Sequence, residues 1–404
     1  MYIYKAGVIG GGAMGAEIAQ VISYSGLPVV LVEVNMELAE KAADKVRSIY
    51  KGRVNKGKMT EAELENKMAL VTVTDKPQEL ADVDIVVEAV PEDLKIKEEV
   101  YKKLDSICQP ETIFTSNTSA LSISRMASFV KRSDRLVGMH FFNPAHVMKL
   151  VEVIPGLQTD DEVTHDVVTF AESLRKIPVV VQECAGFLVN RLLMPYLNEA
   201  CFVIQEGAAT AEEVDKAMTD FGLPMGPAAL SDMLGMDVCS AVADILYEAY
   251  GDRMKPAALI KKLYKLGRLG TKSGKGFYTY PEGGSGELAR IIDEVQKDTG
   301  IKGTAYTPVR LLMPMVNEAV ICLQEKVASA RDIDIAMLAG TGFPREKEGP
   351  LHYADEMGID TVISGLESLK EKHGQRFHPA PMLKRMAAAG FLGKKSKKGF
   401  FDYL

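Results

Sequence analysis

Apolar and polar positions in the first half of the chain follow the pattern of an alternating α/β domain. Short apolar runs typical of buried strands occupy residues 4–9, 29–32, 70–74, 85–87 and 112–115. Between them, apolar residues recur at helical spacing around residues 36–51, 60–67 and 92–107. Strands that alternate with helices predict a doubly wound, mostly parallel sheet, whose ligands bind at the carboxyl ends of the strands.

The second half of the chain is helical and contains a tandem repeat. From about residue 184 the strand pattern stops, and Arg-Leu-Leu-Met-Pro at 191–195 recurs at 310–314. Asn-Glu-Ala at 198–200 recurs at 317–319 with the same offset. A repeat of this length indicates a duplicated helical domain. We therefore expect an α/β domain over 1–183, helical domains over 184–280 and 303–404, and a linker with a short helix over 281–302.

A glycine-rich turn joins the first predicted strand to the first helix. Gly10, Gly12 and Gly15 form G-x-G-x-x-G and enclose Ala13 and Met14. The first glycine permits a tight turn, the second lets the backbone approach a pyrophosphate, and the third lets helix and strand pack closely. The helix N-terminus then presents free N–H groups to the phosphates. The turn predicts a Rossmann-type dinucleotide-binding domain, although such glycines can also serve a turn alone.

A carboxylate ends the second predicted strand. Glu33 follows the apolar residues 29–32, about 20 residues beyond the glycines, where the dinucleotide fingerprint places an acidic residue. A carboxylate there accepts hydrogen bonds from ribose hydroxyls and repels a 2′-phosphate. We therefore expect the cofactor to be NAD rather than NADP.

Three polar stretches near the predicted carboxyl edge of the sheet contain candidate catalytic groups. They are Ser-Asn-Thr-Ser at 116–119, His-Phe-Phe-Asn-Pro at 140–144, and Glu152 within an apolar run. Two neighbouring strands joined by the turn at 143–144 would place His140 beside Glu152. A histidine oriented by a carboxylate is a suitable general base for a dehydrogenase. The alternative is that His140 is a core histidine and Glu152 an exposed strand residue.

Two further motifs accompany these stretches: Met-Lys-Leu-Val-Glu-Val at 148–153 and Gly-Phe-Leu-Val-Asn-Arg at 186–191. In this order, the motifs closely resemble those of the 3-hydroxyacyl-CoA dehydrogenase family. The resemblance extends over residues 5–280. It implies a Rossmann-type domain followed by helical domains. It also implies NAD-dependent, reversible oxidation of (S)-3-hydroxyacyl-CoA to 3-oxoacyl-CoA in fatty-acid or related β-oxidation.

The resemblance also implies roles for individual residues. The family's catalytic base matches His140 and its orienting acid matches Glu152. Its groups that hydrogen-bond substrate oxygens match Ser119 and Asn190, and Asn143 would help to shape the pocket. The full predicted cofactor set is Gly10, Gly12, Ala13, Met14, Gly15, Glu33, Glu92, Lys97, Asn117 and Asn143. The family usually has aspartate at the position of Glu33.

A basic cluster follows the second predicted helix of this acidic protein. It consists of Lys51, Arg53, Lys56 and Lys58. The family binds coenzyme A near a corresponding helical insertion, so we expect Lys51 and Lys56 to contact the coenzyme A part of an acyl-CoA substrate. The alternative is a solvated helix end, which is the usual role of a charge run.

Composition excludes several other classes of function. The net charge of −7 argues against a nucleic-acid surface. The five cysteines are scattered and form no CxxC pair, which favours a reducing compartment and predicts no metal site. No apolar stretch is long enough to span a bilayer, and the first strand begins too early to leave room for a signal peptide. We expect a cytoplasmic enzyme.

The second helical copy has lost one candidate group, because Val309 stands where the first copy has Asn190. We expect this copy to be structural and to pack on the first as an internal pseudo-dimer, leaving either a monomer or a further homodimer. Docking to a separate hydratase or thiolase stays open. Two other functions also stay open: a dehydrogenase of a 3-hydroxy acid without coenzyme A, and a non-catalytic NAD-binding protein.

Overall fold

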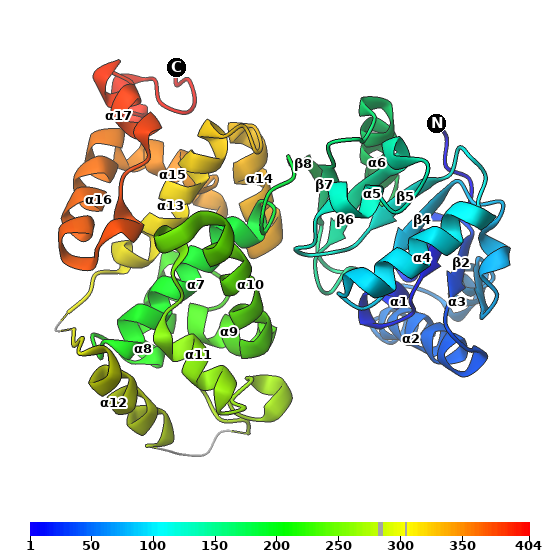
Figure 1. Ribbon diagram of the computed structural model, residues 1–404, viewed down its shortest axis with the longest axis horizontal. Helices are drawn as coiled ribbons and strands as arrows, with labels where there is room; N and C mark the ends of the chain where they lie inside the picture. The colour runs from blue at the N-terminus through cyan, green and yellow to red at the C-terminus, as the bar shows by residue number, and fades with distance from the viewer. Residues whose placement is uncertain (282–285, 304) are drawn as a thin grey trace. The chain divides into compact units, whose positions relative to one another are not determined.

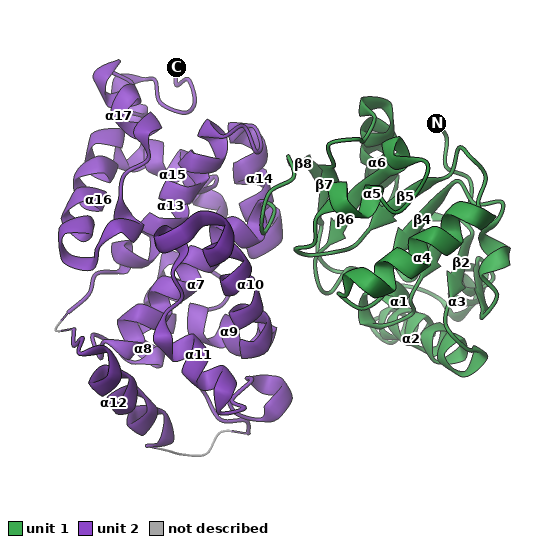
Figure 2. Ribbon diagram, in the orientation of Figure 1, with its two compact units in different colours: residues 1–187 green, residues 188–404 purple. Residues whose placement is uncertain are grey.

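The computed structural model describes residues 1–281, 286–303 and 305–404. It divides the chain into two compact units, residues 1–187 and residues 188–404 (Figure 2). Residues 282–285, near the start of the expected linker, lie outside the described residues.

The first unit is built on an eight-stranded, mostly parallel sheet (Figure 1). The strands lie in the order β3-β2-β1-β4-β5-β6-β7-β8. Their bounds are β1 Ala6–Ile9, β2 Val29–Val32, β3 Val71–Thr74, β4 Ile85–Glu88, β5 Ile113–Ser116, β6 Leu136–Phe141, β7 Leu150–Pro155 and β8 Ile177–Val180. The expected Rossmann-type, doubly wound architecture is confirmed.

Helices cover both faces of this sheet. They are α1 Ala13–Ser25, α2 Met36–Asn55, α3 Glu61–Met68, α4 Leu94–Ile107, α5 Ile123–Ala127 and α6 Asp161–Ser173. One core joins α1, α2 and α6 to strand residues such as Val87, Met139 and Val153. Phe114 instead contacts Tyr101 of α4, with ring centroids 6.2 Å apart, and this places α4 on the opposite face.

The two-residue period of the strands determines where the candidate site lies. Successive side chains of a strand point to opposite faces. Val87, Met139 and Val153 belong to the core of α1, α2 and α6. Glu88, His140, Glu152 and Ser116 therefore share the other face, on the side of α4.

The strand β7 runs antiparallel to β6, whereas the pairs from β3 to β6 are parallel. A short turn therefore suffices to connect β6 to β7. The register pairs His140 with Glu152. β8, which the strand pattern did not predict, pairs with β7 at the edge of the sheet.

The second unit consists of two helical copies with matching helices. The first copy contains α7 Val189–Gln205, α8 Ala211–Phe221, α9 Pro227–Leu234, α10 Met236–Tyr250 and α11 Ala258–Lys265. The second contains α13 Pro308–Gln324, α14 Ala330–Thr341, α15 Pro350–Met357, α16 Ile359–His373 and α17 Pro381–Ala388. The linker helix α12 spans Glu287–Thr299. The two copies pack on each other through α7 and α13 (Figure 1).

Buried ion pairs cross between the two copies in a symmetric arrangement. Arg191 of α7 donates to Glu318 of α13 at 2.8 Å. Arg310 of α13 donates to Glu199 of α7 at 2.7 Å and to Glu206 at 2.9 and 3.0 Å. Each arginine is at most 1% exposed. The repeated Arg-Leu-Leu-Met-Pro segments thus supply the cations that join the copies.

Among residues 1–281, 286–303 and 305–404, no helix is both long enough and apolar enough to cross a bilayer.

Candidate active site

The structure places His140 and Glu152 directly opposite each other on β6 and β7. His140 Nδ1 lies 2.7 Å from Glu152 Oε2; the histidine is 5% exposed and the glutamate is fully buried. A carboxylate at this distance accepts the Nδ1 proton and leaves Nε2 with its lone pair. The predicted juxtaposition is confirmed, whereas the roles of base and orienting acid stay predictions.

Ser119 lies next to the other nitrogen of the same imidazole. Its Oγ is 3.2 Å from His140 Nε2. The loop that carries Ser119 is held by Glu92, whose Oε1 accepts hydrogen bonds from Ser119 N at 3.0 Å and Thr118 Oγ1 at 2.6 Å. Glu92, predicted as a cofactor residue, therefore also fixes the position of the serine.

A buried ion pair supports this loop from beneath. Lys97 Nζ lies 2.7 and 2.9 Å from the two carboxylate oxygens of Glu88, and 3.3 Å from Glu92. Ser116 Oγ donates to Glu88 at 2.6 Å. Burial raises the pKa of Tyr101 well above its ordinary value, so the phenol keeps the proton that it directs at Glu88, 3.4 Å away.

Glu88 directly follows the predicted strand at 85–87, but its pairing with Lys97 was not predicted from the sequence. Both side chains are at most 1% exposed, and an unpaired charge at such depth would be costly. The Lys97 ammonium is paired with both Glu88 and Glu92, which offsets the cost of burying it. Its predicted contact with the cofactor stays a prediction.

The ends of β5 and β6 are tied together by Asn117. Its Oδ1 accepts a hydrogen bond from Phe141 N at 2.8 Å. Phe142 follows, with its ring centroid 4.5 Å from that of His140, and the exposed Asn143 comes next. The ring of Phe187 lies 6.0 Å from His140. Sequence reasoning did not identify these aromatic neighbours of the imidazole.

The glycine-rich turn fits a dinucleotide. Gly10 has φ of +93°, and a Cβ on Gly15 would lie 1.7 Å from the Gly10 carbonyl oxygen, so only glycine fits at position 15. A Cβ on Gly12 would meet no described heavy atom within 4 Å, which leaves open space above the turn. Within the described residues, no side chain caps the helix that begins at Ala13 and Met14. Its N–H groups and dipole suit a pyrophosphate.

Glu33 follows β2 directly, as predicted, and turns toward the glycine loop. Its Oε1 accepts a hydrogen bond from Gly11 N at 2.5 Å, and its Oε2 accepts one from Val34 N at 3.0 Å. The carboxylate is therefore held at the end of the strand, where the fingerprint places the acidic group that binds ribose.

We predict that Glu33→Ala relaxes the discrimination between cofactors. Removing the carboxylate removes its repulsion of a 2′-phosphate, so the ratio of kcat/KM for NADH to that for NADPH should fall by about tenfold, equivalent to about 1.4 kcal/mol. The exposed Glu99→Ala on α4 serves as the matched control. An unchanged ratio in Glu33→Ala would remove Glu33 from the cofactor set.

Three other predicted residues lie outside this group. Asn190 is the second residue of α7 and belongs to the second unit, so its proximity to His140 stays a prediction. Lys51, near the end of α2, and Lys56, which follows that helix, are exposed. Their contact with coenzyme A also stays a prediction. Arg53 of the same basic cluster instead packs on Tyr24, with its guanidinium 4.5 Å from the ring centroid.

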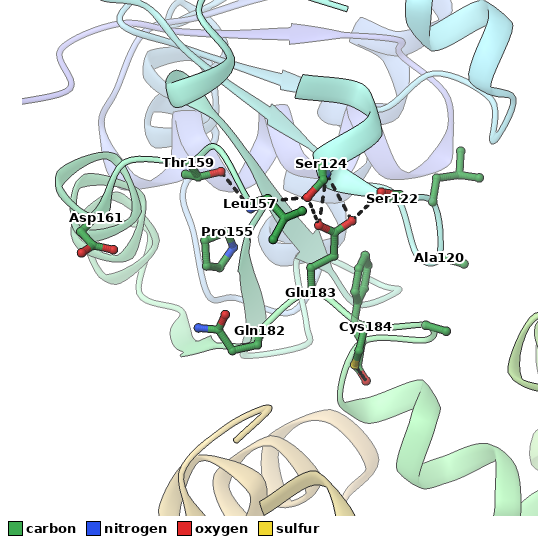
Figure 3. Close-up of a pocket in the computed structure, with 14 residues that line it drawn as sticks. Ala120, Ser122, Ser124, Pro155, Leu157, Thr159, Asp161, Gln182, Glu183 and Cys184 are labelled. Atoms are coloured by element: carbon green, nitrogen blue, oxygen red, sulfur yellow. Dashed lines mark hydrogen bonds between the residues drawn. The ribbon is translucent and has the colours of Figure 1, made fainter. Parts of the chain in front are cut away.

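A pocket of about 740 Å³ opens beside the site (Figure 3). It is lined by Ala120, which follows Ser119, by residues 155–157 at the end of β7, and by Phe187. Glu183 projects into it and accepts hydrogen bonds from Ser122 Oγ at 2.6 Å and from Ser124. Its volume lies within the range of small-molecule sites.

Comparison with known families accounts for nearly the whole chain. The NAD-binding domain of 3-hydroxyacyl-CoA dehydrogenase matches residues 5–184. The C-terminal domain of the same family matches residues 186–280 and matches again at 306–403. The chain belongs to the 3-hydroxyacyl-CoA dehydrogenase family. The double match agrees with the sequence repeat and with the paired helices of the second unit.

Curated relatives resemble the chain over most of its length. The fatty acid oxidation complex subunit alpha of Shewanella sp. (strain ANA-3) is 40% identical over 395 residues, which are 96% of this chain and 56% of that protein. A second such subunit, from Shewanella baltica (strain OS185), is 41% identical over 394 residues, 95% of this chain and 55% of that protein. The chain thus spans about half the length of the curated relatives that it matches.

Solved structures of family members resemble the chain in fold. The 3-hydroxybutyryl-CoA dehydrogenase from Escherichia coli K12 has a TM-score of 0.87 at 29% identity, covering 96% of this chain and 99% of its own. The (S)-3-hydroxybutyryl-CoA dehydrogenase PaaH1 from Ralstonia eutropha has a TM-score of 0.68 at 39% identity, covering 70% of this chain and all of its own.

Proposed function

We propose that the chain catalyses the NAD-dependent, reversible oxidation of (S)-3-hydroxyacyl-CoA to 3-oxoacyl-CoA in fatty-acid or related β-oxidation. The observation that carries the proposal is the hydrogen-bonded series Ser119, His140 and Glu152 in a sheet whose glycine turn fits a dinucleotide. A protein that only bound NAD would have no need of this series. The related 3-hydroxybutyryl-CoA dehydrogenases support a thioester substrate.

In this proposal His140 is the general base of the oxidation. Its Nε2 accepts the proton of the C3 hydroxyl, because the Nδ1 proton is directed at Glu152. The buried carboxylate then stabilises the imidazolium and keeps the ring in place. NAD, when bound, supplies the acceptor for the hydride that leaves C3. In the reverse direction the imidazolium returns its proton to the new alkoxide.

Ser119 and Asn190 are proposed to hold the substrate oxygens. Ser119 Oγ, 3.2 Å from Nε2, can donate to the C3 oxygen and so keep the hydroxyl close to the base. The carboxamide of Asn190 is proposed to bind the thioester carbonyl. Lys51 and Lys56 are proposed to bind coenzyme A phosphates, with KM for the thioester as the parameter that they control.

Stereochemistry and cofactor choice test this proposal together. We expect the enzyme to reduce NAD with (S)-3-hydroxybutyryl-CoA, and to show little activity with the (R) isomer or with NADP. Absorbance at 340 nm measures each rate. Equal rates with the two isomers would contradict the proposed placement of the hydroxyl, and oxidation of free 3-hydroxybutyrate alone would favour a substrate without coenzyme A.

We predict that Glu152→Gln retains NADH binding but lowers kcat by about 10- to 100-fold. The amide keeps the shape of the side chain but loses the negative charge that stabilises the imidazolium in the transition state, and general acid–base catalysis is typically worth about 10²–10⁴-fold. Steady-state kinetics and NADH fluorescence titration measure the two effects. A wild-type kcat would show that Glu152 does not assist His140.

A further inference from the structure

The turn that follows the strand of His140 is compact and partly buried. Residues 142–149 connect β6 to β7, and the N–H groups of Val147 and Met148 both donate to Pro144 O, at 3.0 and 2.9 Å. Ala145, in the middle of the turn, is 1% exposed and packs in the core beneath α1 and α6. The conformation of this turn determines where Phe142 and Asn143 lie relative to the imidazole.

Two charged side chains from distant parts of the first unit hold the polar backbone of this turn. Lys176 Nζ, from the residue before β8, donates to the carbonyl oxygens of Ala145 and, at 2.7 Å, Met148. Glu17 of α1 accepts the Ala145 N–H and lies 3.5 Å from His146 Nδ1. The backbone N–H of Ala145 therefore donates to a carboxylate, and its carbonyl oxygen accepts from an ammonium.

Lys176 is only 9% exposed, and its hydrogen-bond acceptors are backbone carbonyls rather than carboxylates. Burying a lysine ammonium is costly unless its hydrogen bonds recover that cost. An apolar side chain would fill the same space without that cost. The presence of a lysine at position 176 is therefore best explained by the hydrogen bonds that its ammonium makes to the turn.

We propose that Lys176 is a positioning residue of the dehydrogenase site, which together with Glu17 clamps residues 142–149 and holds Phe142 and Asn143 beside His140. This role rests on the proposed function. The clamp joins the turn to α1, whose N-terminus faces the proposed pyrophosphate, so it places the base and the cofactor helix in one rigid frame.

The clamp should weaken in alkaline solution. Burial and, secondarily, the positive charge of Lys149 lower the pKa of Lys176, Glu17 opposes the shift, and together they place this pKa at about 8. The charged groups that act on the ammonium are thus Glu17 from α1 and Lys149 from the turn, and His146 of the turn contacts Glu17. A neutral amine makes weaker hydrogen bonds to carbonyls than an ammonium does. We therefore expect kcat to fall as pH rises through about 8.

The test is the pH profile of kcat from pH 6 to 10 for the oxidation of (S)-3-hydroxybutyryl-CoA. In the wild type we expect an alkaline limb near pH 8. Lys176→Arg should lack this limb, because a guanidinium stays charged throughout the range. Lys149→Met, which removes an exposed like charge, should move the limb to higher pH. Lys103→Met, an exposed lysine of α4, should leave it unchanged.

A second variant, Lys176→Met, is tested by comparing its kcat with its Kd for NADH. At pH 7 we expect kcat to fall by about tenfold or more, since small displacements of catalytic groups are costly, while the Kd for NADH changes by less than about twofold. A wild-type kcat accompanied only by a lower melting temperature would show a merely structural role and overturn the proposal. The same alkaline limb in Lys176→Arg and Lys149→Met as in the wild type would also overturn it. An inactive wild-type enzyme would instead refute the proposed function, and this role with it.

Discussion

His140→Gln is expected to lower kcat by about 10²–10⁴-fold while NADH still binds. Glutamine has nearly the length of histidine but cannot take up a proton near neutral pH. The Nε2 atom that faces Ser119 at 3.2 Å is thereby lost as a base, whereas the glycine turn that fits the dinucleotide is untouched. Single-turnover reduction of acetoacetyl-CoA, measured by NADH absorbance, isolates the chemical step.

His165→Gln is the matched control for this substitution. His165 lies on α6, on the face of the sheet opposite the site. Its replacement should leave kcat within about twofold of the wild type, as expected for a group that takes no part in proton transfer. If His140→Gln retained a normal single-turnover rate of reduction, another group would have to donate the proton to the alkoxide, and the assignment of His140 as the acid–base group would be wrong.

Arg310→Met is expected to lower the free energy of unfolding by about 3–5 kcal/mol, the usual cost of breaking a buried ion pair from one side. The substitution leaves Glu199 and Glu206 with exposures of 1% and 6% and without the guanidinium that binds both. Arg376 still pairs with Glu199, at 2.6 Å, so Glu206 should account for most of the loss.

Urea unfolding followed by circular dichroism measures this effect, with Lys216→Met as the control. Lys216 and Asp220 form an exposed pair on α8, and such pairs contribute at most about 1 kcal/mol. NADH binding should persist in Arg310→Met under native conditions, because the glycine turn lies in the first unit. A loss of less than 1 kcal/mol would show that the ion pairs between the helical copies do not stabilise their packing.

The sequence predicted those parts of the fold that local patterns determine. Apolar runs located β1 to β5, and the two strands expected on either side of the turn at 143–144 are β6 and β7. Helical spacing located α2, although that helix continues to Asn55 rather than ending near residue 51. β8 was missed although Ile-Pro-Val-Val at 177–180 is an apolar run, because a proline inside such a run argues against a strand except at the edge of a sheet. An edge strand of this kind is defined by its pairing with β7, which is not a local property.

The part of the candidate site that the sequence could predict lies on two strands joined by a short turn. His140 and Glu152 are 12 residues apart on a hairpin, so their juxtaposition follows from the antiparallel register. The clamp of Glu17 and Lys176 was not predictable, because it depends on a helix and a strand that are brought together only by the folded sheet. Asn190 follows the boundary between the two units, and its role rests on family resemblance.

NADH oxidation with acetoacetyl-CoA, with NADPH and free acetoacetate as parallel controls, tests directly whether the chain is a 3-hydroxyacyl-CoA dehydrogenase in activity. We expect rapid turnover with NADH and the thioester, little turnover in either control, and loss of the activity in His140→Gln. No turnover with the thioester while NADH still binds would contradict this expectation, and would point to another hydroxy acid or to a non-catalytic role.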